Sequence, residues 1–332
     1  MMASTVRQLG EIGLLQHLRQ FCPAGAIADD AAVLSVAAGQ QLVVTTDVLV
    51  QDIHFSDRTT DPYHVGWRAT AANLSDLAAM GAAPLGLTLG LGLPPETALD
   101  WIDPFYQGIG ACLGQYGGVI LGGDLCRAPV ITVAITALGQ VPPSKVLRRS
   151  AARPGDALIV TGYHGASRAG LELLLHPQKG QALAETERQL LIQAHQQPRP
   201  RFDVLPALWQ VCESCNRPLA AMDSSDGLAN AVLQICRESQ TGARLERSRL
   251  PMPPCFSGWL AAETVLDWCL YGGEDFELVL ALPPHLAAAL VEKIGPPAAI
   301  VGQITADSGV TLQDKNGAAI ATLSLEQGFQ HF

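Results

Sequence analysis

Short apolar runs and longer segments of helical period occur along the whole chain, and this mixture constrains the fold most. The strand-like runs are 42–48, 85–93, 118–121, 130–141, 157–161, 276–282 and 298–304. Helical period fits 64–80, 96–116, 166–175, 185–195, 227–238 and 284–294. Pro104 is expected to kink or break the second of these helices. The sequence therefore predicts an α/β or α+β protein.

The chain length predicts two domains. With 332 residues, of which 48% are hydrophobic, the chain can bury a sizeable core. Turn-forming and basic residues from 142 to 156 separate two strand-like runs, which is typical of a domain junction. We place the boundary at residue 148, between an N-terminal α/β domain (1–148) and a C-terminal α/β domain (149–332).

Charge and hydropathy exclude several classes of partner. The 21 basic and 31 acidic residues give a net charge of −10, and no run of Lys or Arg predicts nucleic-acid binding. Residues 1–21 lack the apolar centre of a signal peptide, and the apolar stretch 84–95 is too short to span a bilayer. We expect a cytoplasmic protein with no membrane partner.

The eight cysteines are too sparse for a disulfide scaffold, and we expect free thiols. Cys212 and Cys215 have the spacing of a redox couple or of half a zinc site. Because they fall in an apolar stretch of helical period, we interpret them as buried helix cysteines.

Six short acidic motifs carry the chemical signal. In each, a strand is expected to end or a turn to begin, and a carboxylate stands among small or hydroxyl residues. They are Ala28-Asp29-Asp30, Thr45-Thr46-Asp47, Asn73-Leu74-Ser75-Asp76, Gly122-Gly123-Asp124, Asp223-Ser224-Ser225-Asp226-Gly227 and Gly272-Gly273-Glu274-Asp275. Hydroxyl and carboxylate oxygens are the ligands that Mg²⁺ prefers.

One such motif alone is explained by ordinary turn and cap chemistry; Asp226, for example, could cap the helix that follows Gly227. Turn and cap chemistry does not explain six such motifs together, because converging carboxylates repel one another unless cations lie among them. Magnesium held by a few carboxylates usually also binds substrate phosphates. The motifs therefore predict an enzyme that uses magnesium and ATP.

Known phosphate-binding loops are absent from the sequence. It contains neither a Gly-x4-Gly-Lys-Ser/Thr loop nor a Gly-x-Gly-x-x-Gly segment opening a helix, and it has four lysines. Arg148-Arg149, at the domain junction, is the best basic candidate for a phosphate clamp; the alternative is a solvated surface pair.

The order and spacing of these motifs resemble the thiamine-monophosphate kinase family, a branch of the aminoimidazole ribonucleotide synthetase-like superfamily. The resemblance runs nearly end to end. Besides the acidic motifs, it includes the run from Asn73 to Ala82, Ser225-Asp226-Gly227-Leu228, the extension of the last motif to Phe276-Glu277-Leu278, and the tail from Gly328 to Phe332. The Asn73 run and the tail are the most specific to this branch.

The resemblance implies ligands residue by residue. Several Mg²⁺ ions would be held by Asp30, Thr45, Thr46, Asp47, Asp76, Asp124, Asp223 and Asp226. ATP would contact Tyr106, Gly123, Asp124, Arg149 and Ser225. His54 and Glu274 would face the thiamine moiety, although a lone histidine such as His54 is more often structural. The implied fold has an N-terminal sheet that pairs with its twofold mate in a homodimer.

Four residues, at three places in the chain, depart from the family pattern. Ala28 replaces a glycine, Leu125-Cys126 follows Gly-Gly-Asp where threonines are common, and Glu326 stands where an aromatic residue often stacks on substrate. None of these departures removes a proposed metal-binding carboxylate.

The implied reaction is direct transfer of the ATP γ-phosphoryl group to thiamine monophosphate, giving thiamine diphosphate and ADP. We name no catalytic base. The alternatives are another branch of the superfamily, namely an aminoimidazole ribonucleotide synthetase, a selenophosphate synthetase or a hydrogenase-maturation protein, or a non-catalytic nucleotide-binding regulator. No Lys precedes Lys145 and the last cysteine is Cys269, which disfavours the selenophosphate and hydrogenase branches.

Overall fold

The chain forms two compact units in a computed structural model that describes residues 5–23, 32 and 34–328. The first unit comprises Met1–Leu77 and Ala82–Pro143, and the second comprises Ala78–Gly81 and Ser144–Phe332. Among the helices in the described ranges, none has the length and apolarity needed to cross a bilayer.

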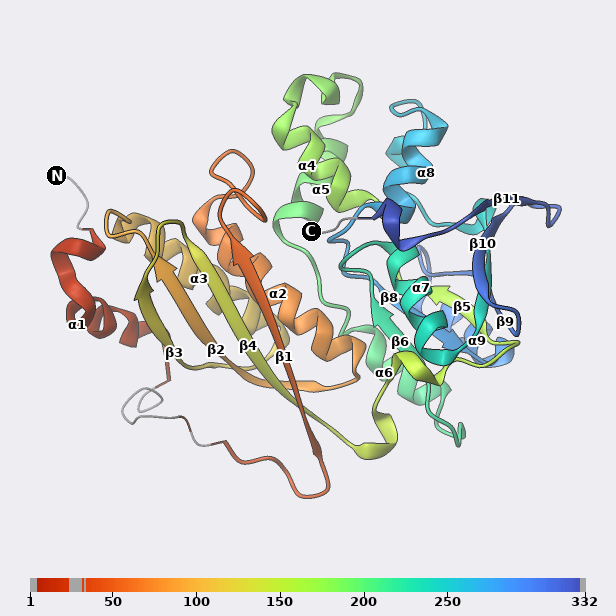
Figure 1. The fold of residues 1–332 in the computed structure, drawn as a ribbon, viewed down its shortest axis with the longest axis horizontal. Helices are drawn as coiled ribbons and strands as arrows, with labels where there is room; N and C mark the ends of the chain where they lie inside the picture. Colours follow the sequence, from red (N-terminus) through yellow and green to blue (C-terminus); the bar gives the residue numbers. More distant parts are fainter. Residues whose placement is uncertain (1–4, 24–31, 33, 329–332) are drawn as a thin grey trace. The chain divides into compact units, whose positions relative to one another are not determined.

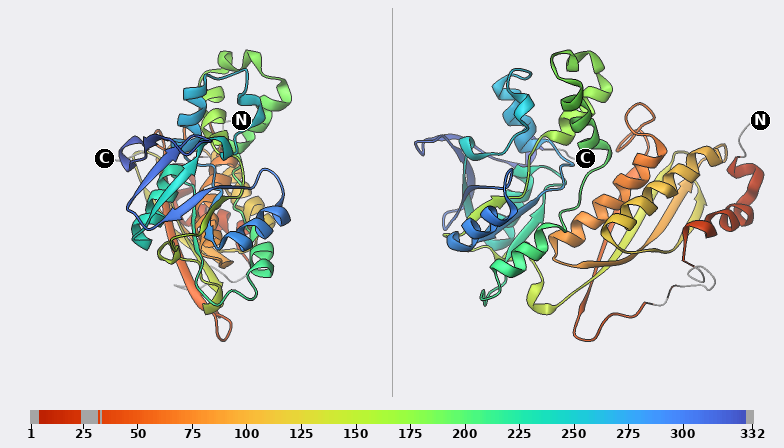
Figure 2. Two further views of the ribbon diagram at one scale, coloured as in Figure 1. Left: turned by 90° about the vertical axis from the view of Figure 1, so that its right-hand side faces the viewer. Right: turned by 180° about the vertical axis from the view of Figure 1, so that it is seen from behind.

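A four-stranded sheet and two long helices build the first unit (Figures 1 and 2). The strand order is β1 (Gln41–Val50), β4 (Thr132–Val141), β2 (Ala83–Leu93) and β3 (Ile120–Arg127). Only β2 and β3 pair in parallel. Helices α2 (Pro62–Ala79) and α3 (Leu99–Tyr116) cover one face of the sheet, and α1 (Val6–Leu18) with η1 (Arg19–Phe21) precedes it.

Two glycines let α2 and α3 pack backbone against backbone. A Cβ on Gly66 would overlap the carbonyl oxygen of Phe105, and a Cβ on Gly108 would overlap that of Tyr63. Helix α3 runs through Pro104 without a break, so the alternative of a broken helix is wrong. Proline removes one helical hydrogen bond there, and the complete burial of Phe105 and other apolar residues of the helix outweighs that loss.

A seven-stranded sheet organises the second unit. Its order is β11 (Ala319–Thr322), β10 (Gly309–Gln313), β7 (Gly242–Glu246), β9 (Ala299–Thr305), β5 (Ala157–Val160), β8 (Leu278–Leu282) and β6 (Ala220–Asp223). Its helices are α4 (Ala166–Leu175), α5 (Glu185–Gln196), α6 (Val204–Val211), α7 (Leu228–Ser239), α8 (Ala262–Tyr271) and α9 (Pro284–Ile294).

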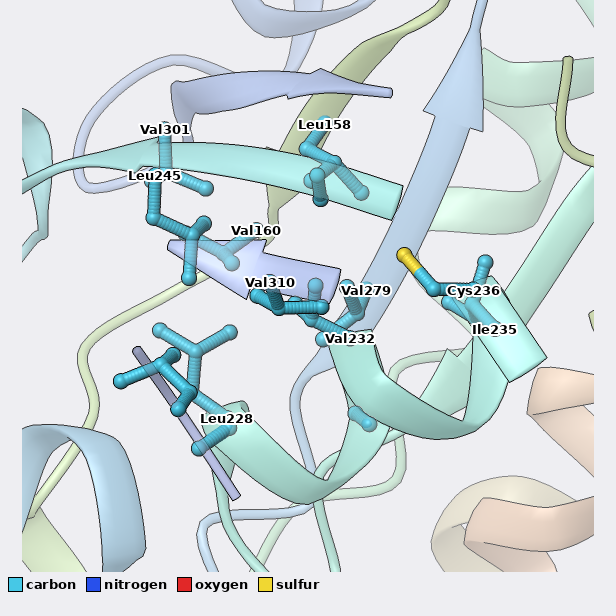
Figure 3. Packing of buried hydrophobic residues seen from close by; sticks show 14 of the residues in the cluster. Leu158, Val160, Leu228, Val232, Ile235, Cys236, Leu245, Val279, Val301 and Val310 are labelled. Atoms are coloured by element: carbon cyan, nitrogen blue, oxygen red, sulfur yellow. The ribbon is translucent and has the colours of Figure 1, made fainter. Parts of the chain in front are cut away.

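Helices cover both faces of this sheet because its central strands direct apolar side chains to the two faces alternately, and both sets are buried. Leu158 and Val160 of β5 belong to the cluster formed with α7, where Val232 lies beside Val279 and Val310 (Figure 3). Ala157 and Ile159 point the other way, into the cluster formed with α6 and α9. The predicted mixed helix and sheet fold class is confirmed.

The cysteine predictions are partly wrong. All eight cysteines are free, as expected. Helix α6, however, ends at Val211, so Cys212 and Cys215 are not helix cysteines. The Cys215 N–H donates to the Cys212 carbonyl (2.9 Å) and closes a turn instead. Cys212 is buried and Cys215 is half-buried.

Candidate functional site

Strand β1 and helix α2 bring two predicted carboxylates to one side of the first sheet. The Thr45 hydroxyl donates to Asp76 Oδ2 (2.5 Å), and the Asp47 N–H donates to Asn73 Oδ1 (3.2 Å). Thr45 and Asp47 are two residues apart on a strand, and Asn73 and Asp76 are three apart on a helix, so each pair shares a side. Asp47 and Asp76 therefore line the same side of β1. Sequence reasoning quoted Asn73 within its motif but assigned it no role.

Thr46 and Asp124 lie on the opposite face of the same sheet. Thr46 pairs with Thr136, whose hydroxyl is 2.8 Å from its own, and Gly90 of the next strand pairs with Asp124. Because β1 and β3 are the two edges of the sheet, three strand spacings, or ~14 Å, separate them. The first unit does not bring Asp124 to Asp47.

The predicted position of the carboxylates at strand ends is wrong for three motifs. Gly122-Gly123-Asp124 lies inside β3, Asp47 lies inside β1, and Asp76 lies inside α2. Gly123, which the sequence suggests as a turn residue, is required for strand packing instead. A Cβ on Gly123 would overlap the Leu89 carbonyl of the paired strand. Close strand pairing and turns both require small residues, and the sequence does not separate them.

His54 is held in one orientation by the backbone. The Val50 N–H donates to His54 Nδ1 (3.0 Å), so Nδ1 carries no hydrogen and the neutral ring is protonated at Nε2. The turn that presents it contains Asp52 at φ 65°, and the buried Arg68 donates to the His54 carbonyl (3.3 Å). The ring is therefore placed by main-chain contacts.

Tyr106, an expected ATP contact, is a core residue of the first unit. It is 5% exposed, stacked on Phe21 with ring centroids 5.1 Å apart and edge-on to Phe105 at 5.4 Å. Burial raises the pKa of Tyr106, so its hydroxyl stays protonated at neutral pH. Asp30, with the neighbouring Ala28, lies outside the described residues.

In the second unit, the loop after β6 collects the predicted residues Asp223, Ser225 and Asp226. Asp223, 2% exposed, ends the strand and accepts a hydrogen bond from the Ser225 hydroxyl (2.9 Å). Gly227 follows at φ 95° and is the N-cap of α7, so Asp226 is not the cap residue. The side-chain oxygens here are all hard donors.

The loop that precedes β8 is joined to the loop after β6. The Glu274 N–H donates to the Ser225 carbonyl (2.6 Å), and the Ser224 N–H donates to the Glu277 carbonyl (2.9 Å). Glu274 and Phe276 have φ values of 69° and 52°, which are strained for residues other than glycine. The structure thus brings Glu274 together with Ser225.

Asp275 anchors the same loop to helix α4. Its carboxylate accepts hydrogen bonds from the N–H groups of Gly165 (2.6 Å) and Ser167 (2.8 Å). Burial raises the pKa of Asp275 to about 7; the two N–H donors oppose this shift, and the charges of Glu277 and Glu274 add to it. Sequence reasoning quoted Asp275 within its motif but did not assign it this role.

Arg149 lies away from these loops in the second unit. It begins the short helix η3 (Arg149–Ala151), and the Ser239 hydroxyl donates to its carbonyl (2.7 Å). Ser239 ends α7, whereas Ser225 precedes the start of α7. Twelve helical residues span ~18 Å, so the main chain of Arg149 is separated from Ser225 by about the length of that helix.

Among the described residues, the carboxylates are not gathered into a group that could hold a metal ion. Within the described residues, no group of three or more His, Cys, Asp or Glu side chains is arranged to hold a metal ion. The predicted carboxylates are divided between the two units, with Asp47, Asp76 and Asp124 in the first and Asp223 and Asp226 in the second.

Comparison with known proteins places the chain in a family. Residues 28–141 match the N-terminal domain of AIR synthase related proteins, and residues 153–315 match the C-terminal domain. The chain is 51% identical over 337 aligned residues to the thiamine-monophosphate kinase of Synechococcus elongatus, covering 99% of this chain and 98% of that protein. The chain belongs to the thiamine-monophosphate kinase family. The resemblance seen in the motifs is confirmed.

Solved structures of the family share the fold. The thiamine-monophosphate kinase of Stenotrophomonas maltophilia K279a superposes with a TM-score of 0.79 at 32% identity, covering 93% of this chain and 98% of that one. The chain named AaThiL, complexed with AMPPCP and TMP, superposes with a TM-score of 0.71 at 26% identity, covering 96% and 99%.

Proposed function

We propose that this chain is a thiamine-monophosphate kinase, which transfers the γ-phosphoryl group of ATP to the phosphate of thiamine monophosphate and releases ADP. The observation that carries the proposal is 51% identity to a thiamine-monophosphate kinase over nearly the full length of both proteins. The solved relative complexed with AMPPCP and TMP supports the same pair of substrates.

The acceptor chemistry explains why no catalytic base is needed. A phosphate monoester has a second pKa of about 6, so its oxygen is already largely ionised at neutral pH. The protein must bring two polyanions together in line and neutralise their charge. The task of the site is thus alignment. We propose that ATP is contacted by Tyr106, Gly123, Asp124, Arg149 and Ser225, and that His54 and Glu274 face the thiamine moiety.

The donor chemistry of the described residues fits magnesium. Asp47, Asp76, Asp223 and Asp226 offer carboxylates, Thr45 offers a hydroxyl, and neither His nor Cys belongs to the proposed set. Mg²⁺ usually takes one or two carboxylates together with substrate phosphates, so a cluster of three protein ligands is not required. We propose that these residues, together with Thr46, Asp124 and Asp30, hold several Mg²⁺ ions. When bound, the metal neutralises charge on the phosphate oxygens.

An ADP-release assay with ATP, Mg²⁺ and a panel of acceptors tests the function. The panel contains thiamine monophosphate, thiamine, formylglycinamidine ribonucleotide and selenide. We expect ADP release only with thiamine monophosphate, with one thiamine diphosphate formed per ADP. Equal release with another acceptor, or none with thiamine monophosphate, would contradict the proposal.

We also propose that the uncovered face of the first sheet pairs with a second copy in a homodimer. Leu42, Val44 and Val48 lie on that face and are 49%, 56% and 47% exposed, and no described helix of the first unit covers them. Aligned exposed apolar side chains of this kind mark an interface. A cytoplasmic location also fits the eight free thiols.

Val44→Glu tests the dimer. A buried, unpaired carboxylate in the interface is expected to weaken association by at least ~100-fold, which sedimentation equilibrium would detect as a shift from twice the chain mass to 35.1 kDa. The control is Leu190→Glu on α5, where the leucine is 66% exposed. A dimer that survives Val44→Glu, or one that Leu190→Glu also dissociates, would show that the pairing face is misassigned.

A further inference from the structure

A buried histidine lies next to the half-exposed carboxylate of Glu274. His195, in the last turn of α5, is 2% exposed, and its Nδ1 lies 3.6 Å from Glu274 Oε2 and 3.1 Å from the Ser167 hydroxyl. The Glu274 side chain is 37% exposed. Residues from α5, α4 and the loop before β8 therefore meet at one ring nitrogen.

The main chain around this contact is fixed. Glu274 is held at φ 69° by its hydrogen bond to Ser225, and the next residue, Asp275, is bonded to the start of α4. Such strained conformations persist only where surrounding contacts determine them. The backbone of Glu274 is thus set, and its side-chain torsions decide where the carboxylate points.

The histidine is fixed as firmly as the loop. A Cβ on Gly170 of α4 would overlap the Leu191 carbonyl and approach the Cβ of His195, so α4 and α5 pack there at backbone distance. The backbone of His195 is therefore held against α4, and its ring is buried. Nδ1 consequently lies close to the Glu274 carboxylate on a backbone that is held in place.

We propose that His195 is a positioning residue, which together with Ser167 orients the Glu274 carboxylate toward the cationic ring of thiamine monophosphate. The inference rests on the proposed function. Thiamine monophosphate carries a positively charged thiazolium ring beside its phosphate, and a carboxylate is the matching charge. At 3.6 Å the His195–Glu274 contact is longer than a hydrogen bond, so we expect it to shorten when the substrate occupies the site.

Two amide substitutions separate positioning from packing. In His195→Asn the amide takes the place of Nδ1, whereas in His195→Gln it takes the place of Nε2. We expect His195→Ala and His195→Gln to raise KM and the calorimetric Kd for thiamine monophosphate about tenfold, because the hydrogen bond to the Glu274 carboxylate that we expect in the substrate complex cannot form. His195→Asn should restore most of this affinity, and KM for ATP should stay within about twofold in all three variants.

A double-mutant cycle with Glu274→Gln completes the test. If His195 acts through Glu274, His195→Ala should change KM for thiamine monophosphate by less than about twofold in the Glu274→Gln background. The inference is overturned if His195→Asn and His195→Gln give the same KM for thiamine monophosphate, or if KM for ATP rises as much as KM for thiamine monophosphate. It is also overturned if His195→Ala still raises KM for thiamine monophosphate in the Glu274→Gln background. If His195→Ala does not fold, the comparison of His195→Asn with His195→Gln tests the inference. If the wild-type protein turns over thiamine monophosphate and the His195 variants do not change KM, only this inference is refuted. If the wild-type protein is inactive with thiamine monophosphate, the proposed function is refuted.

Discussion

Replacing Asp47 with asparagine is expected to lower kcat by ~10³-fold at saturating Mg²⁺ while the protein stays folded. The side chain changes its charge but not its shape. The main chain of Asp47 is held by pairing with Ile135 and by the hydrogen bond from its N–H to Asn73, neither of which needs the carboxylate. The loss should therefore fall on metal binding and turnover, not on stability.

The measurement is steady-state ADP release as a function of Mg²⁺ concentration, with the thermal unfolding midpoint as the test of folding. Asp57→Asn is the matched control, since Asp57 is an exposed turn residue of the same unit and the substitution removes the same charge. A wild-type rate for Asp47→Asn at saturating Mg²⁺ would exclude Asp47 as a metal ligand.

Alanine at Gly66 or at Gly108 is expected to destabilise the first unit by more than ~4 kcal/mol. In each case the new methyl group would overlap a backbone carbonyl oxygen of the facing helix, and a backbone atom cannot rotate away as a side chain can. Helices α2 and α3 would have to separate, which would open the layer that buries Phe105 and Ile109.

Gly110 and Gly114 are the controls for this pair because they belong to α3 and nothing lies within 4 Å of a Cβ added to either. Alanine at these exposed positions should stabilise the helix by ~1 kcal/mol, because glycine is a poor helix former. Chemical denaturation of the four single variants gives the comparison. A Gly66→Ala or Gly108→Ala protein as stable as the controls would mean that the two helices do not pack at backbone distance.

The elements with the strongest periodicity were predictable from the sequence. The helices at 166–175 and 284–294 have the predicted bounds, and β1, β2 and β4 lie within two residues of theirs. Strand β6, Ala220–Asp223, was not predicted because two of its four residues are alanine and a third is aspartate, and neither residue type favours strands. It is a strand because it pairs with β8 along a buried edge.

The sequence listed the oxygen-bearing side chains proposed for the site, but it did not give their geometry. Thr45, Thr46 and Asp47 are consecutive, and strand alternation sends Thr46 to the open face and its neighbours to the side that α2 covers. His195 gave no local signal, since a single histidine on a helix is ordinarily a structural residue. Its contact with Glu274 joins residues 79 positions apart by number, 274 − 195. The contact arises because α5 packs against α4 and Asp275 anchors the loop of Glu274 to the start of α4.

By itself the sequence determined the mixed fold class and the family, and it listed the oxygen-bearing side chains proposed for the site, because hydrophobic periodicity and oxygen-rich motifs are local properties of the chain. The tertiary structure decided which of those oxygens share a side of a sheet, and that Gly123 and Gly66 serve close packing. It also placed the acidic loops after β6 and before β8 in contact. These outcomes depend on strand register and helix packing, which arise from contacts between residues far apart in the chain.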